Sequence, residues 1–119
     1  MKKDDLGQFL PLSAASLQVL LALAAEDMHG YAIMQEVSRQ SEGRLKLGPG
    51  TLYDNLQRMT GLGLIRELPQ GGEGRDGRRR RYRLSSLGRG VLSSEIERLE
   101  SVLREGRIRL GMVQPEKAS

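Results

Sequence analysis

The 119-residue sequence predicts a mainly α-helical fold with one small β-hairpin. Two patterns predict this class. Apolar residues recur at helical spacing from residue 13 to residue 61 and again after residue 86. Between these regions the pattern alternates on both sides of a loop rich in glycine and arginine, as in two strands joined by a flexible connection. A chain of this length forms one compact domain with one extra element.

The first two predicted helices are short and follow a lead-in at residues 1–12. Ser13 is a natural N-cap for the first helix. The apolar face of this helix consists of Leu17, Leu20, Leu21 and Ala24. The second helix follows a break at "MHG" and presents Ile33, Met34, Val37 and Ser41 on one face, with Gly43 as its terminating residue. In the lead-in, Phe9, Leu10 and Leu12 are expected to pack on a partner surface.

A third helix is predicted from Pro49 to the glycines at positions 61 and 63. Proline suits the first helical position, and Leu52, Leu56 and Met59 recur at i, i+4 and i+7. On a helical wheel, Asp54 and Arg58 fall opposite Leu52. The remaining polar positions, at the flanks, are Thr51, Tyr53 and Asn55. This helix therefore has a polar, mixed outer face.

The hairpin is predicted from a strand at residues 64–68 and a second strand at residues 79–85. The loop contains "GEGRDG", which matches a nucleotide-binding G-x-G-x-x-G pattern by letter. That pattern needs a helix to open within it, whereas a strand follows here, so the nucleotide interpretation fails. Residues 75–83 contain six arginines and one aspartate, a local charge of +5 in a chain of net charge +4. Such a concentrated charge is typical of a surface that meets a polyanion, and a merely solvated loop is the alternative.

The last predicted helix spans residues 86–113. Leu92, Ile96, Leu99 and Leu103 follow one another at steps of 4, 3 and 4, the spacing of a helix seam that packs on another helix. The next step falls on Gly106, so the seam is expected to weaken or bend there before Leu110 resumes it. The predicted organisation is a lead-in at residues 1–12, a DNA-binding domain at 13–85, a dimerisation helix at 86–113 and a tail at 114–119.

Composition excludes several classes of protein. The chain has no cysteine and one histidine, His29, so disulfides, cysteine nucleophiles and thiolate metal sites are absent. His29 is expected to be an N-cap or hinge residue, because no nucleophile or carboxylate motif surrounds it. We therefore expect no enzyme, no cofactor and no metal. No apolar run approaches the length of a membrane span, which predicts a cytoplasmic protein.

Three short helices, a polar outer face on the third and a charged hairpin after it predict a winged helix-turn-helix with a C-terminal dimerisation helix. In this arrangement the third helix enters the major groove of duplex DNA and the wing contacts the phosphate backbone. The predicted recognition residues are Thr51, Tyr53, Asp54, Asn55 and Arg58. The predicted wing residues are Arg75, Arg78, Arg79, Arg80 and Arg81. Two alternatives stay open: a protein-interaction module, and a winged helix that binds RNA.

The segments "HGYAIMQEV", "LGPGTLYDNLQRM", "GLGLI" and "GRRRRYRLSSLGRGVL" resemble the PadR family of transcriptional regulators, over about residues 12–103. The resemblance implies a winged-helix repressor that dimerises through its C-terminal helix and leaves DNA when a small effector or another signal acts. It also implies that Thr51, Tyr53 and the arginines 78 to 81 contact DNA. Asp54 stands where the family often has proline, and it either accepts a hydrogen bond from a cytosine amine or points away.

These inferences combine into one hypothesis. In a homodimer, the seam of one subunit packs on the first helix or on the region around Phe9 of the other. The dimer presents two copies of the third helix to half-sites about 10 base pairs apart or a multiple of this, so the operator is an inverted repeat.

Overall fold

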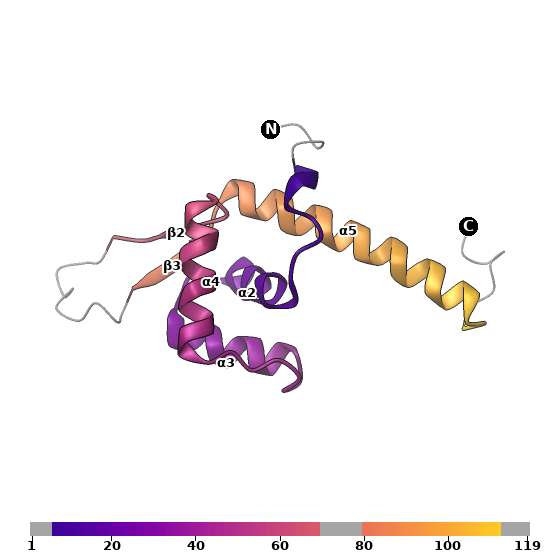
Figure 1. Ribbon diagram of the computed structural model, residues 1–119, viewed down its shortest axis with the longest axis horizontal. Helices are drawn as coiled ribbons and strands as arrows, with labels where there is room; N and C mark the ends of the chain where they lie inside the picture. Colours follow the sequence, from indigo (N-terminus) through magenta and orange to yellow (C-terminus); the bar gives the residue numbers. More distant parts are fainter. Residues whose placement is uncertain (1–5, 70–79, 113–119) are drawn as a thin grey trace.

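The computed structural model describes residues 6–69 and 80–112. Its elements are η1 (Gly7–Phe9), α2 (Ala14–Ala25), β1 (Met28–His29), α3 (Gly30–Gln40), α4 (Pro49–Gly61), β2 (Ile65–Glu67), β3 (Arg81–Leu84) and α5 (Ser86–Arg109). Helix α2 lies at the centre and contacts α3, α4, β3 and α5 (Figure 1). The predicted mainly α-helical class with a small hairpin is confirmed.

The helix ends follow local rules that the sequence reveals. The Ser13 hydroxyl accepts a 3.1 Å hydrogen bond from the Ser16 N–H and caps α2, as predicted. Gly63, at φ +82°, ends α4 because the N–H of Leu64 reaches the carbonyl of Met59 at 2.9 Å. His29 is the N-cap residue of α3, but its side chain makes no capping hydrogen bond.

Three antiparallel strands form the sheet, in the order β1-β3-β2. Both predicted strands are present, although they are shorter than residues 64–68 and 79–85. Tyr82 and Leu84 are buried, whereas Arg81 and Arg83 are exposed, which confirms the predicted alternation. The two-residue strand β1 was not predicted, because so short a segment has no readable period and forms only by pairing with β3. Residues 70–79, which contain most of the predicted loop, lie outside the described residues.

The buried core consists of aliphatic side chains, Met59 and one aromatic residue, Tyr82. The cluster of buried side chains consists of Val19, Leu20, Leu23, Ile33, Val37, Leu47, Leu52, Leu56, Met59, Leu64, Ile65, Tyr82, Leu84, Val91 and Leu92. These residues come from every long element of the fold, so the first turns of α5 belong to the same domain as the three shorter helices. The described residues include no helix that is both long and apolar enough to cross a membrane.

Helix α5 runs without interruption through Gly106 to Arg109. The helix therefore does not break at Gly106, where the seam was expected to weaken or bend. The seam only lacks an apolar side chain at this position. The helix ends before residue 113 because Gly111 takes φ +75° and the N–H of Met112 donates to the carbonyl of Arg107. Beyond the core, α5 extends away from the other helices (Figure 1).

The N-terminal segment packs on the core of its own chain. Leu6, Phe9, Leu10 and Leu12 are partly buried against the core, although a partner surface was expected for the last three. The Leu12 N–H donates a 3.0 Å hydrogen bond to Oε2 of Glu95, a residue that is only 1% exposed. The Arg98 guanidinium also binds this carboxylate, at 2.6 Å, and together with the Leu12 N–H it lowers the pKa of Glu95 against the opposing effect of burial. Glu95 therefore fixes the N-terminal segment to α5.

Gly88 lies where α5 crosses the start of β2, and alanine there is expected to destabilise the protein. A Cβ atom at Gly88 would lie 2.0 Å from the Leu64 carbonyl oxygen and 2.8 Å from Cδ1 of Leu84. Because one of these atoms is backbone, relief requires α5 and the sheet to separate. We expect Gly88→Ala to lower the free energy of unfolding by about 1–3 kcal/mol, as overpacked cores do.

Gly106→Ala is the matched control for Gly88→Ala. Gly106 lies in the same helix, and an added Cβ meets nothing within 4 Å. Alanine is the better helix former by up to about 1 kcal/mol, so this variant should be as stable as the parent or more so. Thermal unfolding at one fixed protein concentration measures both. Equal melting temperatures for Gly88→Ala and the parent would mean that the contact between α5 and β2 is looser than described.

Candidate nucleic-acid interface

Helix α4 has one buried face and one exposed face, as the sequence predicts. Leu52, Leu56 and Met59 are buried. Thr51 and Asp54 are exposed on the outer side of the same helix. Pro49 opens the helix at its first turn, and no carboxylate lies in that turn. A helix with one apolar and one polar face can pack on the core with the first, while the second is free to enter the major groove of DNA.

Two of the predicted recognition residues brace α4 against α2. Nη2 of Arg58 donates to Oδ1 of Asn55 at 3.1 Å and to the hydroxyl of Ser16 at 3.3 Å. The hydroxyl of the buried Ser16 donates a 3.3 Å hydrogen bond to Oδ1 of Asn55. Nδ2 of Asn55 donates to the backbone carbonyl of Thr51 at 3.0 Å. In this arrangement the Arg58 guanidinium is turned back toward α2. Sequence reasoning missed this role because a helical wheel contains no neighbouring helix.

Tyr53 lies against the start of α3. A Cβ atom at Gly30 would be 2.3 Å from the Tyr53 hydroxyl oxygen and 2.8 Å from its Cζ, so only glycine leaves room for this ring. The side chain is still 41% exposed. Tyr53 therefore packs on the start of α3 and still has part of its surface open to solvent.

Sequence reasoning missed Tyr31, which adjoins Gly30. Tyr31 is 66% exposed, and its hydroxyl oxygen accepts a hydrogen bond from Nε2 of Gln35 at 3.2 Å. Its own proton is thus available to donate. Tyr31 is the second residue of α3 and Tyr53 packs on Gly30, the first residue, so both tyrosines adjoin the first turn of this helix, where the helix dipole favours a negative group. The signal in the sequence was the tyrosine of "HGY", directly after the glycine that opens this helix.

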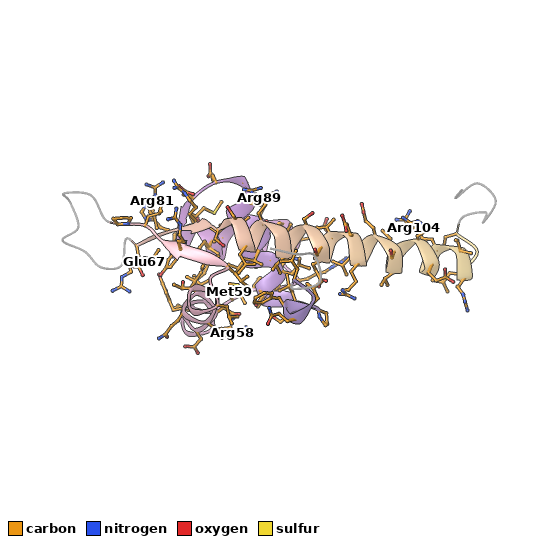
Figure 2. The ribbon with its side chains drawn as sticks, turned by 90° about the horizontal axis from the view of Figure 1, so that it is seen from above. Arg58, Met59, Glu67, Arg81, Arg89 and Arg104 are labelled. Atoms are coloured by element: carbon orange, nitrogen blue, oxygen red, sulfur yellow. The ribbon has the colours of Figure 1, made fainter. Side chains whose placement is uncertain are left out.

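The arginines of the wing divide into two groups. Arg75, Arg78 and Arg79 lie outside the described residues. Arg80 and Arg81 are described, and about half of each side chain is exposed. Arg80 pairs with Glu67 at 3.3 Å. In Figure 2, Arg81 and Arg58 lie on opposite sides of the molecule, so these two described arginines do not belong to one compact basic cluster.

Arg81 shares a carboxylate with Arg83. Nη2 of Arg83 lies 2.8 Å from Oδ2 of Asp27, and its Nε lies 3.2 Å from Oδ1, which is a bidentate contact. Nη2 of Arg81 lies 3.7 Å from the same Asp27 oxygen. The hydrogen bond from Arg83 has the largest effect on the pKa of Asp27 and lowers it, so this carboxylate is charged at neutral pH. Neither Asp27 nor Arg83 was among the predicted site residues, because 56 positions separate them in the chain.

The predicted seam on α5 is covered at one end and exposed at the other. Leu92 is only 7% exposed and packs in the core of the chain. Leu99 is partly buried, whereas Ile96 is 37% and Leu103 54% exposed. The apolar surface continues with Val102, Leu110 and Met112, which are all exposed. We call Ile96, Leu99, Val102, Leu103 and Leu110 the α5 stripe.

A small hollow of about 260 Å³ lies beside the N-terminal segment and the end of α4. Its apolar lining consists of Phe9, Pro11, Leu12, Met59, Leu62 and Leu64. Leu62, one of these lining residues, is 47% exposed. This surface and the α5 stripe are two apolar areas on the described part of the chain.

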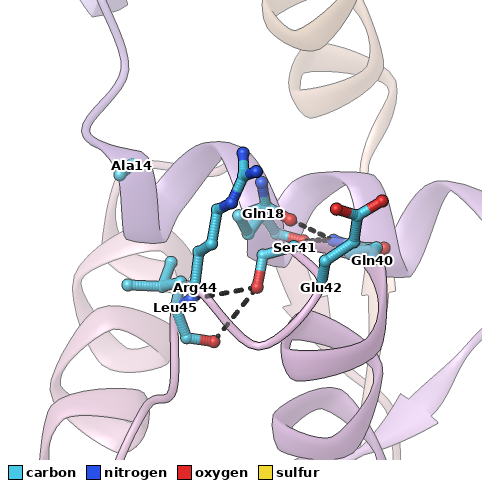
Figure 3. Close-up of a pocket in the computed structure, with 7 residues that line it drawn as sticks. All are labelled: Ala14, Gln18, Gln40, Ser41, Glu42, Arg44 and Leu45. Carbon is cyan, nitrogen blue, oxygen red and sulfur yellow. Dashed lines mark hydrogen bonds between the residues drawn. The ribbon is translucent and has the colours of Figure 1, made fainter.

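A larger hollow of about 520 Å³ lies between α2 and the loop after α3 (Figure 3). Two of its polar side chains, Gln18 and Gln40, bind each other, and a third, Ser41, binds the backbone. Nε2 of Gln40 donates to the backbone oxygen of Gln18 at 2.6 Å and to Oε1 of Gln18 at 2.9 Å, and the Ser41 hydroxyl accepts from the Leu45 N–H at 3.0 Å. These bonds hold the helix-turn-helix loop and supply no acid-base pair. Within residues 6–69 and 80–112, no group of histidine and carboxylate side chains is arranged to hold a metal ion.

Comparisons with known proteins agree on one group. The model of the Transcriptional regulator PadR-like family matches residues 19–94. The transcriptional regulator Rv3488 of Mycobacterium tuberculosis is 34% identical over 93 residues, which are 78% of this chain and 82% of that protein. A transcriptional regulator from Clostridium thermocellum has a similar fold, with a TM-score of 0.65 at 21% identity over 87% of this chain and 92% of the other. A PadR family regulator from Clostridium difficile R20291 gives 0.60 at 22% identity over 85% and 100%.

Proposed function

Because the chain belongs to the PadR-like family of transcriptional regulators, we propose that it is a dimeric repressor that binds an inverted-repeat operator in duplex DNA. The observation that carries this proposal is helix α4, whose exposed polar face is followed directly by a hairpin with the arginines of the wing. A helix of this kind fits the major groove, and the arginines of a wing fit the phosphates beside it. Members of this family are transcriptional regulators and not enzymes.

The proposed contacts divide by type. Thr51 and Asp54 are exposed on α4 and face the bases, with Asp54 accepting from a cytosine amine. Tyr53 and Tyr31 donate to phosphate oxygens near the start of α3 and so set the position of the protein without reading sequence. Asn55 and Arg58 hold α4 on α2, and Arg58 reaches DNA only if it leaves Ser16. Arg75 and Arg78 to Arg81 bind phosphates along the wing.

The proposed dimer joins the two apolar areas. The α5 stripe of one subunit packs on the Phe9 region of the other, where Leu62 and the small hollow offer apolar surface. Support comes from the exposure of Ile96 and Leu103 in the isolated subunit and from the 4, 3, 4 spacing of the seam. The resemblance to the family supports two further parts of the proposal, a cytoplasmic location and release from DNA by a small effector.

Selection of bound sequences from a random duplex pool tests this function. At about 150 mM salt, where weak contacts between exposed charges are screened, we expect enrichment of an inverted repeat with half-sites about 10 base pairs apart or a multiple of this. A parallel pool of A-form RNA is the control. No enrichment of DNA would favour a protein-interaction module, and enrichment of RNA alone would favour an RNA-binding winged helix.

A further inference from the structure

The exposed side of the sheet carries several arginines around one carboxylate. Arg81 and Arg83 alternate with the buried Tyr82 and Leu84, so both point to the exposed side of β3. Arg66 of β2 is paired in register with Arg83 and is also exposed. Asp27 immediately precedes β1, which pairs with the other edge of β3. Its carboxylate is therefore surrounded by guanidinium groups from the strand that leads out of the wing.

The contacts of Asp27 are those that a phosphate would make. Its two oxygens receive Nε and Nη2 of Arg83, and one of them also lies 3.7 Å from Nη2 of Arg81. Arginine binds carboxylate and phosphate through the same planar fork. The Asp27 side chain is 20% exposed, whereas about half of each arginine faces solvent, so a DNA strand can approach the arginines from outside.

We propose that Asp27 is an internal counter-anion, which occupies Arg81 and Arg83 in the free protein and thereby weakens the capture of non-cognate DNA by the wing. This inference rests on the proposed function. A guanidinium that is already neutralised by a carboxylate contributes little to the release of counterions from DNA, which is the main source of non-specific affinity. A genome offers about 10⁶–10⁹ non-specific sites, so a lower affinity for them raises the fraction of protein on the operator.

The strength of these ion pairs suits such a role. Ion pairs between exposed side chains contribute only about 0–1 kcal/mol, so correctly docked DNA can displace Asp27 at small cost. Arg80 has its own partner, Glu67, at 3.3 Å, and that pair is separate from Asp27. Each described arginine of the predicted wing thus has a carboxylate beside it, and Asp27 differs in serving two arginines at once.

Asp27→Asn tests the inference through the salt dependence of binding to a non-specific duplex. We expect the slope of log K, where K is the association constant, against the logarithm of the salt concentration to become steeper by about 0.9–1.8, because one or two more phosphates are neutralised. If the two proteins bind alike at 1 M salt, this corresponds to about 5- to 30-fold tighter binding at 0.15 M. Glu105→Gln is the matched control. It removes the same charge from a carboxylate in the last turns of α5, which pairs with Arg109 at 2.6 Å, and should leave the slope unchanged.

A second set of variants separates this role from a general effect on folding. Arg81→Gln and Arg83→Gln, added to Asp27→Asn, should remove the gain in slope, while thermal unfolding verifies that each variant is folded. An unchanged slope in Asp27→Asn, or weaker binding, would overturn the inference, since weaker binding would mean that Asp27 orients the arginines toward DNA. If the parent protein binds no duplex DNA at all, the proposed function fails and this inference fails with it.

Discussion

Replacing Arg78, Arg79, Arg80 and Arg81 with serine is expected to weaken binding to every duplex, cognate or not, by about 30- to 1000-fold at 0.15 M salt. Each phosphate neutralised by an arginine contributes about −0.9 to the slope of log K against log salt. Four free arginines would therefore flatten the slope by about 3.6, and two by about 1.8. The lower value applies if Glu67 and Asp27 keep Arg80 and Arg81 neutralised in the free protein. Titration of a labelled duplex at four or more salt concentrations gives the slope directly.

The sequence preference of the wing variant provides the internal control. Arginines on phosphates set position and affinity, so the ratio of cognate to non-cognate affinity should change much less than either affinity. Serine at Arg104, Arg107 and Arg109, on the far part of α5, removes positive charge away from the wing and should leave the slope nearly unchanged. A wing variant with the slope of the parent would show that the arginine block is only a solvated loop.

The elements that the sequence predicted well are those set by local chemistry. The cap at Ser13, the proline at the first turn of α4 and the glycine that ends this helix each act within a few residues. Their effects are therefore visible in a short stretch of sequence. Strand β1 is the counterexample, because two residues become a strand only when β3 lies beside them.

The candidate site was predicted less completely because its decisive contacts are between distant parts of the chain. Arg58 was placed on the outer face of its helix, yet its guanidinium binds Ser16, which is 42 positions away. The Tyr53 ring lies against Gly30, where a side chain at position 30 would clash with it. The Asp27 carboxylate accepts a hydrogen bond from Arg83 of β3. A helical wheel or an alternation pattern shows on which side a residue lies, but it does not show the residue that comes to meet it.

The seam on α5 illustrates the same limit. The spacing of Leu92, Ile96, Leu99 and Leu103 is regular, so the sequence pattern alone does not distinguish between these four positions. In the folded chain Leu92 is covered by the core of the same chain, whereas Leu103 is 54% exposed, and the C-terminal part of α5 extends away from the core (Figure 1). The period of a helix identifies an apolar face, whereas the length of the rest of the domain decides how much of that face remains for a partner.

Ile96→Asp combined with Leu103→Asp is expected to convert the dimer to a monomer and to lower affinity for the full operator by about 10²- to 10⁴-fold. Both side chains are substantially exposed in the isolated subunit, so the carboxylates do not enter its core. In a dimer they would bring four negative charges into an apolar contact. Once one half-site is bound, the second binds at a high effective concentration, and this advantage disappears with the dimer. Light scattering coupled to size exclusion gives the mass, and a single half-site duplex should bind both proteins alike.

Ser93→Asp combined with Ser101→Asp is the matched control for the seam. Both serines are exposed on α5 and lie off the α5 stripe, and their replacement by aspartate adds the same charge as the seam variant. This variant should remain a dimer and keep the affinity of the parent for the operator. If it dissociates as the seam variant does, charge on α5 rather than loss of an apolar contact is the cause. A seam variant that stays dimeric and binds the operator normally would place the dimer contact elsewhere, and the exposed leucines of α5 would then need another partner to cover them.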